Sequence, residues 1–316
     1  MVSSTDSADV RPILKGPLSP IKHALLIGLS AGIALGSGCR QDPEKQAEDL
    51  IESGKYREAI SKLETLVQKE ERGRSLLLLG DAYARLKDFN QADSCYRRAL
   101  SSDSTLKSKV LTAYLYLGDE LSSSKEDPLA VKAWERVLTL APDYELEERF
   151  YHLGDYYFTS QNYRRASQLY ARALSSSPFS QLAREGRYRL VLSLERLGEL
   201  EQALRWCQES GASANGDLLY EEGKIAYSLA EKSLRDGDAE RALQLLRRTM
   251  ELEQPRILLD DAYFMAGEIH FQREEYEEAL GFYRKVISTS PYQKGGVVQK
   301  ARARIQEVKS KRGAGK

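Results

Sequence analysis

A spaced pattern of small and aromatic residues returns along most of this chain and constrains its fold more than any other feature. In the clearest form a Gly stands 12 residues before an Ala, and an aromatic residue follows that Ala after four residues. The four clearest copies are Gly80, Ala92 and Tyr96; Gly118, Ala130 and Trp134; Gly154, Ala166 and Tyr170; and Gly267, Ala279 and Tyr283. Three copies also carry a Pro 12 residues after the Ala, at Pro142, Pro178 and Pro291. Repetition at this interval predicts an array of small helical units rather than one enclosed core.

The spacing predicts that each unit is a pair of antiparallel helices joined by a short turn. We expect the Gly and the Ala of a unit, such as Gly154 and Ala166, to face each other where the two backbones approach most closely. A larger side chain there would overpack the contact and cost roughly 1–3 kcal/mol. The aromatic residue is expected to fill the gap between neighbouring hairpins, and the Pro to end the second helix.

This pattern resembles the tetratricopeptide repeat over about residues 40–292. The resemblance implies an all-α fold, a right-handed superhelical solenoid of about seven helix–turn–helix units with a C-terminal capping helix, and we place the array at residues 47–292. Aligned on the Ala, the units begin near residues 40, 73, 111, 147, 184, 223 and 260. Units one, five and six depart from the pattern, because Ala47, Val191 and Ala230 stand in place of the Gly.

The charge of the chain is balanced, with 47 Lys and Arg residues against 47 Asp and Glu residues. No global field attracts nucleic acid, so we predict no nucleic-acid partner. Residues 293–316 are predicted to form a basic capping helix and tail, since the segment 296–316 holds seven basic residues against Glu307 alone. Its expected inner face consists of Val297, Val298, Ala301 and Ile305. A contact with anionic lipid or with a partner is the alternative role for this basic segment.

The amino end has the order of a targeting segment. An apolar run of 12 residues, 24–35, follows basic residues; small residues come next, and then Cys39. This order is typical of a secretory signal. The run is shorter than the roughly 20 residues that a transmembrane helix needs. We therefore assign residues 1–38 to a signal peptide.

A Cys directly after small residues resembles the lipobox of bacterial lipoproteins, in which the Cys is lipidated and becomes the mature amino terminus. The usual Leu three places before the Cys is Gly36 here, with Leu35 one place earlier. Several acyl chains would hold the protein on a membrane, with residues 39–46 as the lipidated Cys and a tether. By resemblance to proteobacterial lipoproteins, Arg40 favours an outer-membrane lipoprotein that faces the periplasm of the cell envelope. The alternative is an ordinary signal peptide with a chance Cys.

The remaining reactive residues show no catalytic arrangement. Cys95 and Cys207 fall in units two and five, too far apart in a linear array for a disulfide. His152 and His270 are the histidines after the predicted signal, and neither has a partner at metal-ligand spacing. No Gly-rich phosphate loop is present. The sequence therefore predicts no enzyme activity, no cofactor and no metal site.

By the family's pattern, positions 2, 5, 9, 12 and 13 of each unit point into a concave face lined by the first helices. Position 5 becomes aromatic along the array, and position 9 is mostly acidic. The candidate binding residues from these stripes, with two from position 12, are Leu77, Asp81, Leu115, Asp119, Tyr151, Asp155, Phe158, Tyr188, Tyr227, Glu231, Phe264, Glu268 and Phe271. Aromatic side chains supply contact area at low entropic cost, and carboxylates pair with Arg or Lys of a guest. The alternative is that part of this stripe is common repeat chemistry.

These features predict a membrane-anchored adaptor that binds other proteins or peptide segments of envelope complexes. The architecture resembles the repeat lipoproteins of outer-membrane protein assembly and of pilus secretin assembly. Two alternatives remain open. One is an accessory factor of a cell-wall enzyme that binds glycan through the aromatic residues, and the other is a structural protein that self-associates through its end units.

Overall fold

The computed structural model describes residues 42–209, 216–290 and 295–314, and all regular structure in these ranges is helical. The first helices of the successive hairpins are α1 (Pro43–Glu52), α3 (Gly73–Arg85), α5 (Lys107–Ser123), α7 (Arg149–Thr159), α9 (Ala183–Arg196), α11 (Gly216–Arg235) and α13 (Leu259–Gln272). The second helices are α2 (Tyr56–Lys69), α4 (Phe89–Ser102), α6 (Asp127–Leu140), α8 (Tyr163–Ser176), α10 (Leu200–Gln208), α12 (Ala239–Leu252) and α14 (Tyr276–Thr289). The helix α15 (Gly296–Ala314) follows, and the short 3-10 helices η1 (Ser104–Leu106) and η3 (Arg256–Leu258) precede α5 and α13. The predicted all-α array of hairpins is confirmed.

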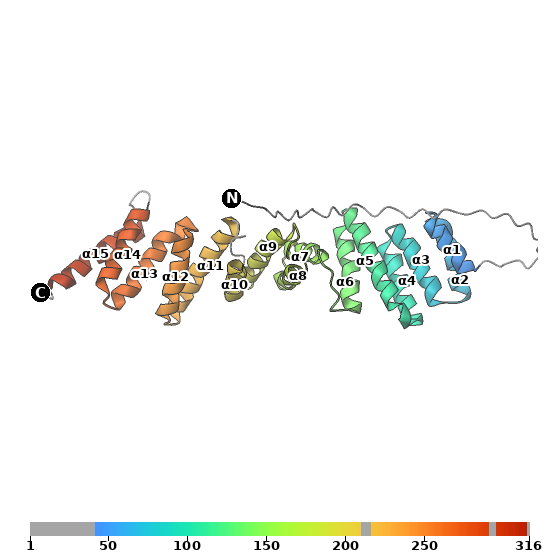
Figure 1. Cartoon of the computed structure of the whole chain (residues 1–316), viewed down its shortest axis with the longest axis horizontal. Helices are drawn as coiled ribbons and strands as arrows, with labels where there is room; N and C mark the ends of the chain where they lie inside the picture. Colours follow the sequence, from blue (N-terminus) through green and yellow to red (C-terminus); the bar gives the residue numbers. More distant parts are fainter. Residues whose placement is uncertain (1–41, 210–215, 291–294, 315–316) are drawn as a thin grey trace, which may run out of the picture. The chain divides into compact units, whose positions relative to one another are not determined.

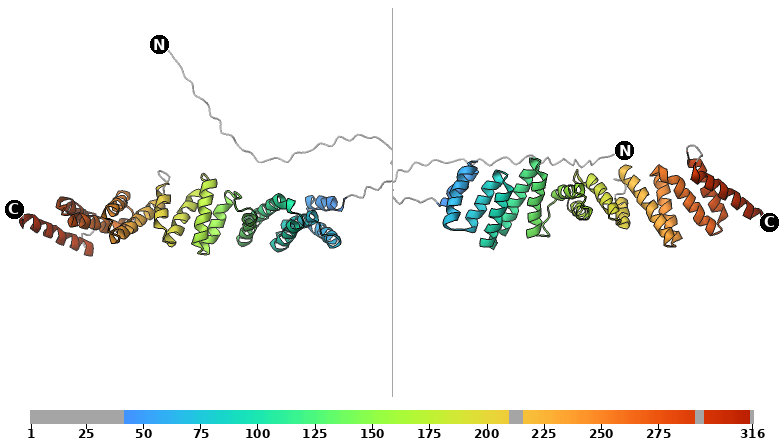
Figure 2. Two further views of the ribbon diagram at one scale, coloured as in Figure 1. Left: turned by 90° about the horizontal axis from the view of Figure 1, so that it is seen from below. Right: turned by 180° about the vertical axis from the view of Figure 1, so that it is seen from behind.

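The hairpins follow one another in the order of the sequence, as Figures 1 and 2 show from three directions. One apolar cluster of buried side chains extends from α3 to α11, and smaller clusters lie at α1–α4, α11–α13 and α14–α15. Helix α1 already begins at Pro43, so residues 43–46 of the predicted tether are helical. The predicted signal segment and Cys39 lie outside the described residues. None of the described helices combines the length and the apolar composition needed to cross a bilayer.

Each hairpin turns at a residue in the left-handed region, two positions after the first helix ends. These residues are Gly54, Lys87, Lys125, Gln161, Gly198, Gly237 and Glu274, with φ between 60° and 83°. Gly reaches this region without steric cost, whereas other residues do so at a penalty. The three hairpins that lack the Gly in the first helix, α1–α2, α9–α10 and α11–α12, are the three that have a Gly in the turn.

The Gly of the first helix packs on the aromatic residue of its own hairpin, which corrects the sequence-based expectation. A Cβ added to Gly154 would lie 2.6 Å from the ring of Tyr170, and one added to Gly267 would lie 2.7 Å from the ring of Tyr283. The ring therefore fills the space inside the hairpin rather than a gap between hairpins. Ala166 is fully buried, but it is not among the nearest neighbours of Gly154.

The C-terminal helix α15 covers the last hairpin. Val298, Ala301 and Val308 are buried against α14, with Val297 and Ile305 partly buried beside them. Both cysteines in the described chain are free and buried, in α4 and α10. Burial raises the pKa of the Cys95 thiol to about 11 and that of Cys207 to about 12, so both thiols pack as small apolar groups.

Candidate functional site

The acidic residues at position 9 accept hydrogen bonds inside their own hairpins. In four hairpins the aromatic residue of the second helix donates to the acid 15 positions earlier on the first helix. The pairs are Tyr96 Oη with Asp81 Oδ1 at 2.9 Å, Trp134 Nε1 with Asp119 Oδ1 at 3.3 Å, Tyr170 Oη with Asp155 Oδ1 at 2.6 Å, and Tyr283 Oη with Glu268 Oε1 at 2.6 Å. The ring that packs on the Gly of a hairpin thus also orients its acid.

Three of these four acids also bind an arginine from the first helix of the next hairpin or from α15. The pairs are Arg149 with Asp119, with both N–O distances 2.6 Å, Arg304 with Glu268, with both 2.8 Å, and Arg189 with Asp155 at 2.7 Å. The hydrogen bonds with Asp119 raise the pKa of the Arg149 guanidinium. These three carboxylates are therefore paired within the array rather than left for a guest.

Asp81 has no such arginine. In the part of the chain that the structure describes, no ion pair joins Asp81 to α5, the first helix of the next hairpin. Ala113 occupies the place in α5 that Arg149 occupies in α7, since each stands five residues before the packing glycine, Gly118 or Gly154. A methyl group therefore replaces the guanidinium at this one boundary.

The second arginine position is also replaced. Tyr116 of α5 corresponds to Arg189 of α9, and Arg85 of α3 is turned onto it, with Arg85 Nη1 2.5 Å from Tyr116 Oη and its guanidinium carbon 4.2 Å above the ring. Burial raises the pKa of the Asp81 carboxyl to about 6, and the Tyr96 hydrogen bond and the charge of Arg85 oppose this rise only in part.

An open groove of about 660 Å³ lies where the arginine is missing. It is lined by three consecutive first helices, α1, α3 and α5, all near the amino end of the array in Figure 1. The lining residues are Glu48, Ile51, Arg74, Leu77, Leu78, Asp81, Ala84, Arg85, Lys109, Thr112, Ala113 and Tyr116. An apolar floor with a few polar groups is typical of a binding site.

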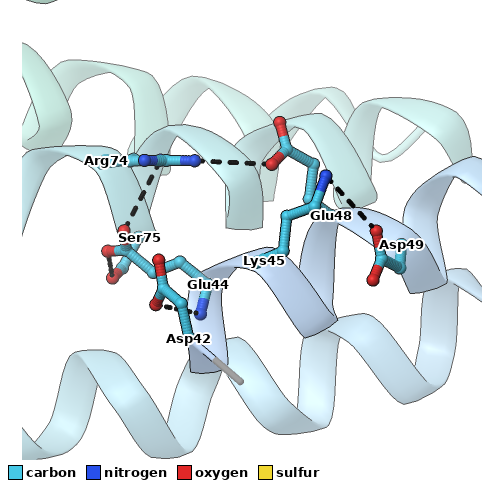
Figure 3. Close-up of polar contacts among 7 residues, drawn as sticks. All are labelled: Asp42, Glu44, Lys45, Glu48, Asp49, Arg74 and Ser75. Carbon is cyan, nitrogen blue, oxygen red and sulfur yellow. Dashed lines mark hydrogen bonds and ion pairs between the residues drawn. The ribbon is translucent and has the colours of Figure 1, made fainter. Parts of the chain in front are cut away.

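The rim of this groove at α1 is fixed by a charge network. Figure 3 shows Arg74 of α3 between Glu44 and Glu48 of α1, with N–O distances of 3.5 and 3.4 Å. Ser75 Oγ donates to Glu44 Oε1 at 2.5 Å. The charge of Arg74 is therefore compensated by its neighbours, and this side of the groove is preorganised.

The second helices hold the same boundary together on the other side. Asp93 of α4 accepts two hydrogen bonds from Arg136 of α6, at 2.7 and 3.0 Å, and one from Tyr114 of α5 at 2.8 Å. Arg97 adds an ion pair at 3.1 Å. The Asp93 side chain is only 8% exposed. This buried network joins α3–α4 to α5–α6 while their first helices remain free to line the groove.

Tyr151 is buried, contrary to the prediction that it lines the binding face. Its ring packs on Gly186 of the next hairpin, where a Cβ would lie 2.5 Å away, and its hydroxyl donates to the carbonyl of Ser177 at 2.9 Å. The Gly in the neighbouring first helix leaves space for the ring, so Tyr151 is a packing residue between hairpins.

The other predicted residues are distributed along the array. Leu77 and Asp81 line the groove. Leu115, Phe158 and Tyr188 are partly buried against the main apolar cluster, Tyr227 and Phe264 against the clusters nearer the carboxyl end, and Phe271 lies under Arg304 and Lys311. Glu231 is partly exposed on α11. Binding by these residues stays a prediction, because the structure does not gather them into one site.

Most of the groove residues were not chosen from the sequence, although a signal for them was present. Positions 2, 12 and 13 of unit two are Arg74, Ala84 and Arg85, and position 12 of unit one is Ile51. Applying all five positions of the repeat would have found these four. Lys109 precedes its unit and carries no comparable signal.

The arrangement is suited to binding rather than to catalysis. No group of three or more His, Cys, Asp or Glu side chains able to hold a metal ion occurs in the ranges that the structure covers. Along the groove the polar groups are Arg, Lys, Glu, Asp, Thr and Tyr side chains spread over three helices. Such a surface can hold an extended or helical segment by apolar contact and by a few directed polar bonds.

Comparison with known proteins identifies the repeat. Models described as tetratricopeptide repeat match residues 73–105, 151–217 and 227–294. No curated protein sequence matches the chain at a significant level.

Several solved structures are similar in fold. A tetratricopeptide repeat protein from Parabacteroides merdae shares 19% identity at a TM-score of 0.35, covering 84% of this chain and 97% of that one. YrrB, described as a repeat protein with an unusual peptide-binding site, shares 20% identity at a TM-score of 0.35, covering 66% and 97%. A chain in the structure of Naa15/Naa10 bound to HypK-THB shares 17% identity at a TM-score of 0.39; the match covers 84% of this chain but only 38% of that one.

Proposed function

The chain belongs to the tetratricopeptide repeat family, and from this premise we propose that it is a membrane-tethered adaptor that holds a segment of a partner protein in the groove lined by α1, α3 and α5. Proteins built from this repeat mediate protein–protein or peptide binding, and the fold is typically an interaction scaffold rather than a catalytic one. The location of the groove and the role of the tether are specific to the proposal.

The observation that carries the proposal is the missing arginine at Asp81. In the hairpins that follow, the same position is filled by Arg149 or Arg189, and the carboxylate is paired. At Asp81 the equivalent space is open and continuous with an apolar floor. An open groove of this size, with one rim already fixed by charge pairs, can accept a partner segment with little rearrangement.

The tether in this proposal is Cys39. It is supported by the sequence order of basic, apolar and small residues before the Cys. Lipidation of Cys39 would place the groove close to the membrane surface, because α1 begins only four residues later. The adaptor would then act in the bacterial envelope, at the periplasmic face of the outer membrane, and capture a segment of a larger envelope assembly.

Two measurements test this function. Cys39→Ala is expected to move the protein from the membrane fraction to the soluble fraction, and an unchanged distribution would remove the tether from the proposal. A photo-crosslinking residue at Thr112, exposed on the groove, is expected to trap a partner in cells. The matched control is the same residue at Lys132, exposed on the second helix α6. Trapping at Lys132 but not at Thr112 would contradict the groove as the binding site.

A further inference from the structure

We propose that the groove receives an arginine side chain from an apolar segment of the partner, and that Asp81 is the receptor of its guanidinium. The inference rests on the proposed function and names the chemistry of the guest. It follows from how the array treats the same position elsewhere.

The array contains its own examples of the proposed contact. Asp119 accepts a hydrogen bond from Trp134 of its own hairpin and two from Arg149 of the next hairpin. Asp155 is arranged in the same way between Tyr170 and Arg189. In each case the acid is prepared by one aromatic donor and completed by one guanidinium.

At Asp81 the first half of this arrangement is present and the second is not. Tyr96 donates to Asp81 Oδ1 at 2.9 Å, as the aromatic residues of the other hairpins do. No cation of the next hairpin completes it, because α5 has Ala113 and Tyr116 at the two arginine positions. A guanidinium supplied by a partner would complete the contact that the neighbouring boundaries complete from within the chain.

The basic residues of the groove do not offer an equally good receptor for an anionic guest. Arg74 is compensated by Glu44 and Glu48. Arg85 is bound to Tyr116 through its hydroxyl and its ring. Only Lys109 is left on the exposed edge of the groove, where an ion pair contributes little.

The surroundings of Asp81 favour arginine over lysine. A planar guanidinium can bond both carboxylate oxygens, as Arg149 does, and can stack on an aromatic ring, as Arg85 does on Tyr116. The floor formed by Leu77 and Leu78 would contact the apolar side chains beside the arginine. The guest is therefore an arginine within a short apolar segment, extended or helical.

The test is a selection from a library of random 12-residue peptides displayed on phage against the full chain. We expect the selected peptides to be enriched in an arginine flanked by apolar residues. The enrichment should be lost with Asp81→Asn, which removes the charge, and with Ala113→Arg, which supplies an internal arginine at the place of Arg149. The matched control is Asp119→Asn, which removes the corresponding charge one hairpin further and should leave the enrichment intact.

Each outcome decides something. Enrichment in Asp or Glu, or an arginine enrichment that persists with Ala113→Arg, would overturn the inference. Groove-dependent peptides without arginine, lost with Ala113→Arg but retained with Asp119→Asn, would also overturn it while leaving the adaptor function standing. A selection without any groove-dependent peptide would remove both.

Affinity and folding measurements complete the test. For a selected peptide, replacing its arginine by Gln should weaken binding to the wild-type chain at least about tenfold by fluorescence anisotropy, and replacing it by Lys should weaken it less. Ala113→Arg should raise the midpoint temperature of unfolding, because it gives Asp81 a partner, and this rise should vanish when Asp81→Asn is also present. A rise that survives in the double variant would contradict the assignment of Asp81.

Discussion

The two boundaries of the hairpin α5–α6 are held together from opposite sides. Toward α3–α4 the charged link lies between second helices, where Asp93 binds Arg136. Toward α7–α8 it lies between first helices, where Asp119 binds Arg149. The difference shows how a repeat array can open a groove without losing cohesion, since the link is moved to the side that the partner does not use.

The largest expected effect tests the link between second helices. Asp93→Ala should lower the free energy of unfolding by about 3 kcal/mol, because it leaves the buried Tyr114 hydroxyl and Arg136 without their acceptor. Urea unfolding followed by circular dichroism measures it. The corresponding change at the other boundary, Asp119→Ala, should cost much less, and equal costs would contradict the comparison.

The next effect should be the same on both sides, because it lies inside the hairpins. Gly80→Ala and Gly154→Ala should each cost roughly 1–3 kcal/mol by pressing a methyl group onto Tyr96 or Tyr170. The control is Gly281→Ala in α14, where a Cβ meets nothing within 4 Å and the gain in helix propensity should stabilise by up to about 1 kcal/mol. Thermal unfolding of the three variants decides it, and a clear difference between the first two would place part of the asymmetry within the hairpins.

The third prediction concerns pH. Because burial raises the pKa of Asp81 from 3.8 to about 6, the folded chain keeps a proton that the unfolded chain releases between about pH 4 and 6. This contribution to stability therefore decreases as the pH rises through that window, and above it the ionised carboxylate is a net cost. Asp81→Asn should remove the dependence and stabilise the chain by roughly 1–2 kcal/mol at pH 7, with little change near pH 4.

Unfolding midpoints of the wild type and of Asp81→Asn at pH 4 and pH 7 check this prediction. A destabilised Asp81→Asn at pH 7 would show that Arg85 or another cation already compensates Asp81. In that case the contrast with Asp119 would disappear.

The smallest effect tests the link between first helices. Asp119→Asn should cost about 0.5–1 kcal/mol, since the pair with Arg149 is partly exposed. The difference from the wild type should shrink in 1 M salt, which screens exposed charges. A salt-independent loss would indicate that the hydrogen bond from Trp134, rather than the ion pair, is the important part of this contact.

Much of the fold could be predicted because it depends on local chemistry. Turn residues such as Gly54 and Gly237, the buried Ala of each second helix and the apolar face of α15 are all fixed by contacts within one or two helices. The candidate site was predicted less well. The burial of Tyr151 depends on Gly186 in the next hairpin, and the opening at Asp81 depends on a residue that is absent from α5. Such relations between hairpins follow from the reach of long side chains, which the period of the repeat does not encode.

The short sequence span of the defining contacts has a consequence for how the chain acquires its structure. The Gly–aromatic contacts join residues 16 apart, and the links from acid to arginine join residues 30 to 36 apart. Loops of this length close at small entropic cost, and folds dominated by local contacts fold within microseconds to milliseconds. Synthesis, at about 5–20 residues per second, is far slower. The hairpins α3–α4 and α5–α6 can therefore assemble the complete groove while the last third of the chain has yet to be made.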